Sequence, residues 1–167
     1  MTNPASSGQE FFVVSWEKFH LDCQKLAAHL RSLQPWEGVI AVARGGLVPA
    51  AILAHELNIR LVDSVTIVSY DDETCEKGNL QILKGIDEGD GRAWLIVDDL
   101  VDTGSTARAL KKMLPGAHLA TVYAKPAGLS LADSHVQEVP QGVWIVFPWE
   151  HHPEAPEHSS TNNFNKY

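Results

Sequence analysis

Two adjacent carboxylates, Asp98 and Asp99, are the strongest candidates in the sequence for residues that bind a ligand. They follow the short apolar run 93–97, and a third carboxylate, Asp102, comes shortly after them. Neighbouring carboxylates repel each other and do not by themselves help a chain to fold, so they favour a ligand. The groups that suit them are vicinal hydroxyls or a divalent cation with oxygen ligands.

The residues after the carboxylates favour an anion. Val101 and Asp102 lead into a helical stretch through Thr103, Gly104, Ser105 and Thr106. We expect Ser105 or Thr106 to cap this helix, whose positive end, backbone N–H groups and hydroxyls together suit a phosphate. A phosphate cradle beside a diol acceptor predicts a site for a ribose 5-phosphate. The alternative is a solvated acidic turn followed by a capped helix.

A second loop adds a positive charge. The apolar run 38–42 reads as a buried strand, and Arg44, Gly45 and Gly46 separate it from a helix that begins near Leu47. Glycines allow the backbone to approach a ligand closely, and the arginine fork matches phosphate oxygens. The alternative is an ordinary turn between strand and helix, with a solvated arginine.

Two further candidates lie nearer the end of the chain. Lys125 ends the strand 118–124, at the edge where parallel sheets bind ligands, although a lysine before proline is also common in surface turns. Trp144 lies in the apolar run 143–147 and could be an ordinary core residue. The sequence alone does not decide whether Lys125 and Trp144 belong to a ligand site or have only these structural roles.

The elements that position these residues predict an α/β fold. A central, largely parallel sheet flanked by helices is expected, with strands at 38–42, 61–70, 93–97 and 118–124 and a helix from Ser15 to Leu33. Residues 11–14 could form a further short strand, and 143–147 is the last apolar run of the chain. The acidic stretch 71–90 predicts a long functional loop with a short edge strand at 80–83.

Length and composition set the outer limits. A chain of 167 residues can form one domain with a full core, and the net charge of −8 argues against a nucleic-acid partner. No apolar stretch is long enough to span a bilayer and no signal peptide is evident, so a cytoplasmic location is expected. Cys23 and Cys75 are expected to be free thiols, and 151–167 a solvated polar tail.

Several segments, in one order, carry a family resemblance. These are 38–49, 68–71, 95–106, 123–128 and 148–149. Over about residues 11–150 the chain resembles the type I purine phosphoribosyltransferases, which use phosphoribosyl pyrophosphate (PRPP). The resemblance implies one phosphoribosyltransferase domain at 1–150, with a small hood built from the terminal segments.

The resemblance also implies residue roles. The ribose and 5′-phosphate would be bound by Asp98, Asp99, Val101, Asp102, Thr103, Gly104, Ser105 and Thr106. Arg44 and Gly45 would bind pyrophosphate, in a loop with a cis peptide between Ala43 and Arg44. The purine would meet Asp102, Lys125, Trp144 and Ile145, with Lys125 donating to O6 and Trp144 stacking on the ring. Asp99 would contribute to a Mg²⁺ site.

The implied reaction transfers a 5-phosphoribosyl group from PRPP to N9 of guanine or xanthine, with hypoxanthine a weaker substrate. Asp102 would handle the proton that the base loses, and 71–90 would close over PRPP. The resemblance further implies a homo-oligomer, a dimer or tetramer, and offers a peripheral place at the inner membrane. Val146 stands where an acidic residue is expected and Glu150 where an aspartate is, so recognition at purine C2 stays undefined.

Two rival functions remain at this point. One is a phosphoribosyltransferase for another base, such as adenine or orotate. Lys125 and Trp144 argue against adenine as the base. The other is a regulatory protein of the same fold that senses PRPP or a nucleotide and controls RNA or DNA. The net charge of −8 weighs against the second rival.

Overall fold

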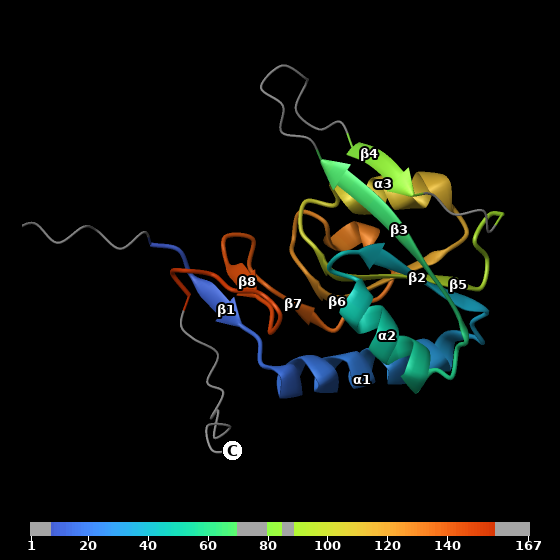
Figure 1. Ribbon diagram of the computed structural model, residues 1–167, viewed down its shortest axis with the longest axis horizontal. Coiled ribbons are helices and arrows are strands. Elements are labelled where there is room, and N and C mark those ends of the chain that lie inside the picture. The colour runs from blue at the N-terminus through green and yellow to red at the C-terminus, as the bar shows by residue number, and fades with distance from the viewer. Residues whose placement is uncertain (1–7, 70–79, 85–88, 156–167) are drawn as a thin grey trace, which may run out of the picture. The chain divides into compact units, whose positions relative to one another are not determined.

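The computed structural model describes residues 8–69, 80–84 and 89–155 (Figure 1). The chain divides into two compact units, a larger one of residues 21–141 and a terminal one built from 1–20 and 142–167. Most of the predicted flap 71–90, and the tail beyond Ala155, lie outside the described residues. Within the described part, no helix has the length and apolar character needed to cross a membrane.

Each of the three α-helices connects two strands, as expected for an α/β fold. In chain order they are β1 (Phe11–Val13), α1 (Trp16–Leu33), β2 (Gly38–Ala43), α2 (Leu47–Glu56), β3 (Leu61–Ser69), β4 (Leu80–Lys84), β5 (Trp94–Val101), α3 (Ser105–Met113), β6 (His118–Ala124), the 3₁₀ turn η1 (Leu129–Leu131), β7 (Gln137–Glu138) and β8 (Trp144–Val146). All of the predicted strands are present, whereas η1 and β7 were not predicted and β8 was expected only as an apolar run.

The larger unit is a six-stranded sheet in the order β4-β3-β2-β5-β6-β7. All neighbours pair in parallel except β3 and β4, so the predicted edge strand is confirmed as an antiparallel edge. Side chains alternate across the sheet, and Ile40 and Ile96 face a cluster that includes Leu110 of α3. The intervening residues Val39 and Leu95 are fully buried on the other face. The predicted sheet flanked by helices is confirmed.

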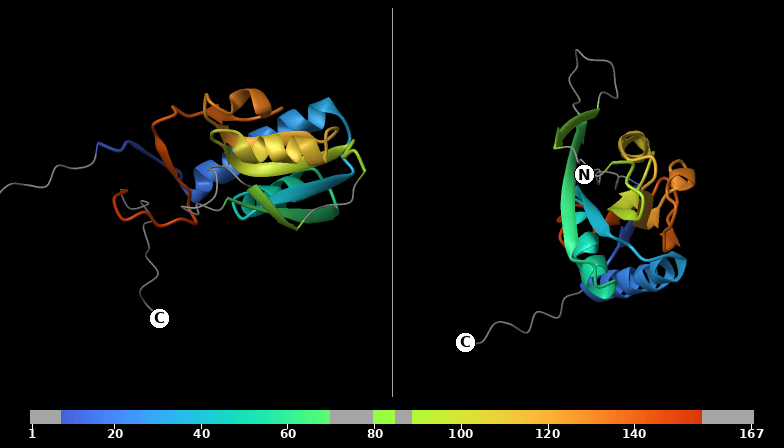
Figure 2. Two further views of the ribbon diagram at one scale, coloured as in Figure 1. Left: turned by 90° about the horizontal axis from the view of Figure 1, so that it is seen from above. Right: turned by 90° about the vertical axis from the view of Figure 1, so that its right-hand side faces the viewer.

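The chain order reverses between β2 and β5. From β2 the chain passes through α2 to β3, toward one edge of the sheet. From β5 it passes through α3 to β6, toward the other edge. Right-handed crossovers in opposite directions place α2 and α3 on opposite faces, as Figure 2 shows. Open α/β sheets bind ligands in the crevice outside such a switch point, at the carboxyl ends of the strands.

Strand β5 is longer than predicted. It begins at Trp94 because Ala93 has a left-handed backbone (φ 62°), and it continues to Val101 instead of ending at Val97. Pairing with β2 stops at Ala41 and Val97, but pairing with β6 runs on to Val101. Asp98 and Asp99 therefore lie inside β5, just past the point where β2 and β5 cease to pair.

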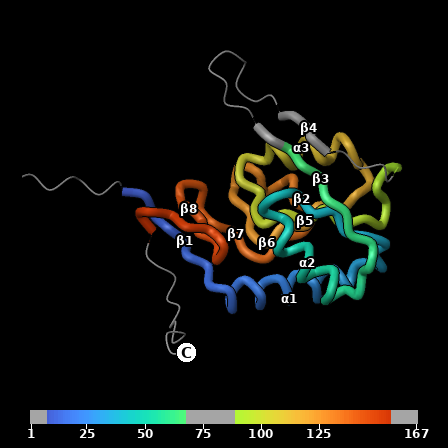
Figure 3. Tube along the Cα trace, in the orientation of Figure 1, coloured from blue at the N-terminus to red at the C-terminus, as the bar shows by residue number. Residues whose placement is uncertain are grey.

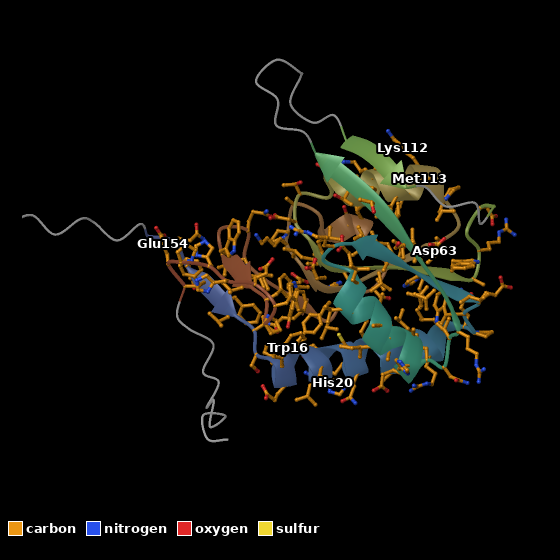
Figure 4. All side chains as sticks on the ribbon, viewed as in Figure 1. Trp16, His20, Asp63, Lys112, Met113 and Glu154 are labelled. Atoms are coloured by element: carbon orange, nitrogen blue, oxygen red, sulfur yellow. The ribbon has the colours of Figure 1, made fainter. Side chains whose placement is uncertain are left out.

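The terminal unit joins segments from opposite ends of the chain. β1 pairs in parallel with β8, Phe11 opposite Trp144, and Figure 3 shows the two strands side by side. Aromatic rings fill this unit: Phe147 stacks on Trp149 with centroids 4.8 Å apart, and Trp149 lies 5.8 Å from the half-exposed Trp16, which is labelled in Figure 4. β8 lies within the apolar run 143–147.

A buried polar pair links α1 to β6. The hydroxyl of Tyr123 donates to Asp22 Oδ2 at 3.0 Å, and both side chains are buried. Lys25 forms an ion pair with the other carboxylate oxygen of Asp22 at 2.8 Å. Cys23, next to this aspartate, is a buried free thiol, and burial, followed by the charge of Asp22, raises its pKa to about 12.

The buried thiol predicts a loss of stability at alkaline pH. An unfolded cysteine ionises near pH 9, so its contribution to stability is complete below pH 9 and is lost as the pH rises toward 12. Between pH 8 and 10.5 we expect Cys23 to remove about 2 kcal/mol from the free energy of unfolding. Urea unfolding of Cys23→Ala should show a correspondingly smaller change over this range. An equal change in both proteins would contradict this assignment.

Candidate active site

The loop between β5 and α3 is built around a glycine. Gly104 has a left-handed backbone (φ 81°) and occupies the N-cap position of α3, so neither Ser105 nor Thr106 is the cap that we predicted. Only a residue without Cβ turns the chain here at low cost, and Ser105 becomes the first helical residue. The hydroxyls of Thr103 and Ser105 lie 3.3 Å apart, and Arg108 donates to the Thr103 carbonyl at 3.1 Å.

This loop borders a hollow that is open to solvent. Its lining comprises Asp98, Leu100, Val101, Asp102, Thr103, Gly104, Ser105, Thr106, Ala107, Leu110 and Leu119. The lining therefore joins a carboxylate of β5 to the hydroxyls and positive helix end at α3. The larger unit brings together these predicted residues around one concave surface.

The two carboxylates in β5 differ in their surroundings. Asp98 Oδ1 accepts a hydrogen bond from the Asp99 backbone N–H at 3.0 Å. Burial, and then the charge of Asp99, raise the pKa of Asp98 well above its ordinary value. Asp99 instead lies against the other predicted loop, because a Cβ added to Gly45 would come within 2.6 Å of its Cγ. The β2–α2 loop therefore lies beside Asp99 of β5.

The β2–α2 loop has the backbone that the family resemblance implies. The peptide bond between Ala43 and Arg44 is cis. Gly46 is packed among main-chain atoms, since a Cβ there would lie 2.8 Å from Val42 N and 2.9 Å from Val42 O. The two glycines therefore have different neighbours, one a side chain and the other the backbone.

This difference predicts two unequal substitutions. Gly46→Ala must displace main chain, so we expect it to lower the free energy of unfolding by about 1–3 kcal/mol or more. Gly45→Ala should cost less, because the Asp99 side chain can turn aside, and should act mainly on ligand binding. Gly8→Ala, with no atom within 4 Å of the added Cβ, is the control. Urea unfolding that ranks Gly45→Ala above Gly46→Ala would contradict this reading.

Lys125 and Asp102 form an ion pair at the ends of β6 and β5. Lys125 Nζ lies 3.0 Å from Asp102 Oδ2, and the lysine side chain is only 8% exposed. Lys125 also donates its backbone N–H to Val101 O at 2.9 Å. The following turn packs onto the β5–α3 loop at Gly128, where a Cβ would lie 2.6 Å from Asp102 O. The surface-turn alternative for Lys125 is therefore wrong, because the side chain points inward to a carboxylate.

One residue at this pair was not predicted from the sequence. Gln141 donates from Nε2 to Asp102 Oδ1, while its Oε1 accepts from the Ala127 backbone N–H at 2.9 Å. It lies in a short turn between a proline and a glycine, where polar residues are common. No local pattern could have connected it to a carboxylate far back in the chain.

Trp144 and Ile145 belong to the terminal unit, whereas the residues described above belong to the larger unit. Ile145 is buried, but Trp144 is 50% exposed, so the core alternative for this tryptophan is wrong. Its ring lies 5.4 Å from that of His152, which in turn lies 4.9 Å from Phe11. An exposed indole supported by aromatic neighbours is able to stack on a planar ligand.

The larger unit offers one candidate carboxylate for a magnesium ion. Among the described residues, no group of three or more His, Cys, Asp or Glu could hold a metal. Mg²⁺ is commonly bound by one or two carboxylates together with waters and substrate phosphates. Asp99, beside Gly45 at the switch point, is a carboxylate of this kind.

Comparisons with known proteins agree with this geometry. The family described as "Phosphoribosyl transferase domain" matches residues 13–155. Xanthine-guanine phosphoribosyltransferases of Chromohalobacter salexigens and Desulfotalea psychrophila are 53% and 52% identical over 139 residues, which are 83% of this chain and 83% and 86% of those proteins. A purine phosphoribosyltransferase structure from Pyrococcus horikoshii has a TM-score of 0.74 at 30% identity, and the match covers 87% of this chain and 98% of that one. The chain therefore belongs to the phosphoribosyl transferase domain family.

Proposed function

We propose that this protein is a purine salvage enzyme that transfers the 5-phosphoribosyl group of PRPP to N9 of guanine or xanthine. Hypoxanthine is the weaker substrate, and the products are a purine nucleotide and pyrophosphate. The proposal agrees with the names of the relatives, which are xanthine-guanine phosphoribosyltransferases at 53% and 52% identity.

The Lys125–Asp102 pair is the observation that carries the proposal. Its members are a donor and an acceptor 3.0 Å apart at neighbouring strand ends. A 6-oxopurine presents O6, an acceptor, next to N7, which carries a proton in one tautomer. Lys125 would donate to O6 while Asp102 accepts from N7, so the pair complements this edge of the base.

The loop residues would bind the other substrate. Backbone N–H groups and hydroxyls of Thr103, Gly104, Ser105 and Thr106 would hold the 5′-phosphate at the start of α3. Asp98 and Asp99, with Val101 and Asp102 beside them, would face the ribose hydroxyls. Arg44 and Gly45 would hold pyrophosphate across the switch point, and the contact of Gly45 with Asp99 supports this arrangement.

The reaction makes one bond and breaks another at the same carbon. N9 bonds to C1′ of the ribose as the bond from C1′ to the pyrophosphate oxygen breaks, through an oxocarbenium-like state. The base then loses the proton at N7 to Asp102, a transfer of general-base type. The protein's other tasks are to place the base against C1′ and to stabilise the negative charge that develops on the leaving group.

Magnesium, when bound, neutralises charge on the pyrophosphate group. Asp99 is the protein ligand that we assign to it. Trp144 is assigned to stacking on the purine ring and Ile145 to backbone contacts with its edge, and both assignments are proposals by family resemblance. So are assembly into a dimer or tetramer, a cytoplasmic location and the single domain at 1–150 with the tail 151–167.

Product formation tests the function. The protein is incubated with PRPP, with and without Mg²⁺, and with guanine, xanthine, hypoxanthine, adenine or orotate, and nucleotide and pyrophosphate are measured. We expect both products, in equal amounts and only with Mg²⁺, from guanine and xanthine. Products from adenine or orotate alone would favour another transferase, and PRPP binding without products would favour a regulatory protein.

A further inference from the structure

Gln141 closes a ring of contacts around the Lys125–Asp102 pair. The two oxygens of Asp102 are used separately: Oδ2 pairs with Lys125 Nζ at 3.0 Å, and Oδ1 accepts from Gln141 Nε2. The same amide accepts from Ala127 N–H at 2.9 Å, and Ala127 lies in the turn that begins at Lys125. A single side chain therefore joins the carboxylate to the backbone of the turn that carries the lysine.

The orientation of this amide is defined by its partners. The Ala127 N–H can only donate, so the amide oxygen of Gln141 must face it. The NH₂ group must then face the Asp102 carboxylate, which can only accept when ionised. A carboxylate in place of the amide would satisfy Ala127 but would place two negative groups together, and an asparagine is one methylene too short to reach both partners.

We propose that Gln141 is a positioning residue for base recognition, an inference that rests on the proposed function. When a 6-oxopurine binds, Lys125 and Asp102 must exchange their mutual contact for contacts with O6 and N7. The bond from Gln141 uses the other carboxylate oxygen, so it survives this exchange. Gln141 thereby holds Asp102 at the correct distance from the Lys125 turn in both states.

This role predicts a selective loss. The amide does not lie among the residues around the phosphate hollow, so its removal acts on the base and spares PRPP. We expect Gln141→Ala to lower kcat/KM for guanine about 10- to 100-fold, the usual effect of losing a hydrogen bond to a charged group. The dissociation constant for PRPP should stay within about twofold. Gln141→Glu keeps the shape of the side chain but replaces the hydrogen bond to Asp102 with repulsion between two carboxylates. Its kcat/KM for guanine should fall at least as far.

A glutamine elsewhere provides the matched control. Gln24 is also exposed and also donates its amide to a carboxylate, Glu56 Oε1, at 3.0 Å, but it lies on α1. Gln24→Ala should leave both kcat/KM and PRPP binding unchanged. The measurement is steady-state kinetics with guanine at saturating PRPP for the wild type and the three variants, with PRPP affinity from calorimetry.

The outcomes separate this inference from the proposed function. A wild-type protein that forms no nucleotide would overturn the proposed function, and the role of Gln141 with it. An active wild type with unchanged kcat/KM in Gln141→Ala would overturn the role of Gln141 alone. Equal losses in guanine kinetics and PRPP affinity would show a general structural effect and would also overturn it.

Discussion

Adenine should be essentially inert with this protein, while guanine and xanthine both react. Lys125 Nζ donates to O6, but adenine carries an amino group at that position, so a donor would face a donor. A site built around a hydrogen bond rejects an analogue that cannot form it by up to about 10⁴-fold. The ratio of kcat/KM for guanine to that for adenine measures this discrimination.

Substitution of the lysine tests whether it is the cause. Lys125→Ala should lose rate with every 6-oxopurine and leave Asp102 without its partner at 3.0 Å. Lys112→Ala is the matched control, because this lysine is exposed on α3 (labelled in Figure 4). If the wild type used adenine as fast as guanine, the role of Lys125 would have to be abandoned.

Loss of the Asp102 charge should slow turnover more than any other single change at β5. General acid–base groups contribute about 10²- to 10⁴-fold, so Asp102→Asn should lower kcat by a factor in this range. PRPP binding should change little, because the asparagine keeps the shape of the loop and Gly104 still turns the chain. Single-turnover kinetics with guanine and calorimetry with PRPP measure the two effects separately.

A surface aspartate gives the comparison for this change. Asp133 is exposed and forms an ion pair with Lys111 Nζ at 2.6 Å, and Asp133→Asn should have wild-type turnover. Full turnover in Asp102→Asn at every pH would remove Asp102 from the chemistry. A proportional loss of PRPP affinity would instead assign it to substrate binding.

Much of the fold could be predicted because the signals are local. Continuous apolar runs such as 38–42 predict buried parallel strands, and three- and four-residue apolar spacing predicts α1. The end of β5 could not be predicted, since Asp98 and Asp99 resemble a strand end. Their strand conformation depends on hydrogen bonds to β6, which lies more than twenty residues further along the chain.

In the site, too, the residues with local sequence signals could be predicted and those that depend on distant contacts could not. The loop around Gly104 could be predicted because a glycine between a strand and a helix is a local signal. The N-cap of α3 is Gly104, with a left-handed backbone, and not Ser105 or Thr106 as expected. Lys125 was located by its place after a strand. Gln141 reaches Asp102 across 39 positions, and no spacing rule connects residues so far apart.

A crystal structure with guanosine 5′-monophosphate bound would test the central claim most directly. We expect the phosphate against the backbone of Thr103–Thr106, the ribose hydroxyls on Asp98 and Asp99, and O6 within hydrogen-bonding distance of Lys125 Nζ. We also expect the Gln141–Asp102 bond to be retained. A nucleotide bound elsewhere, or one whose base does not meet Lys125 and Asp102, would contradict the account.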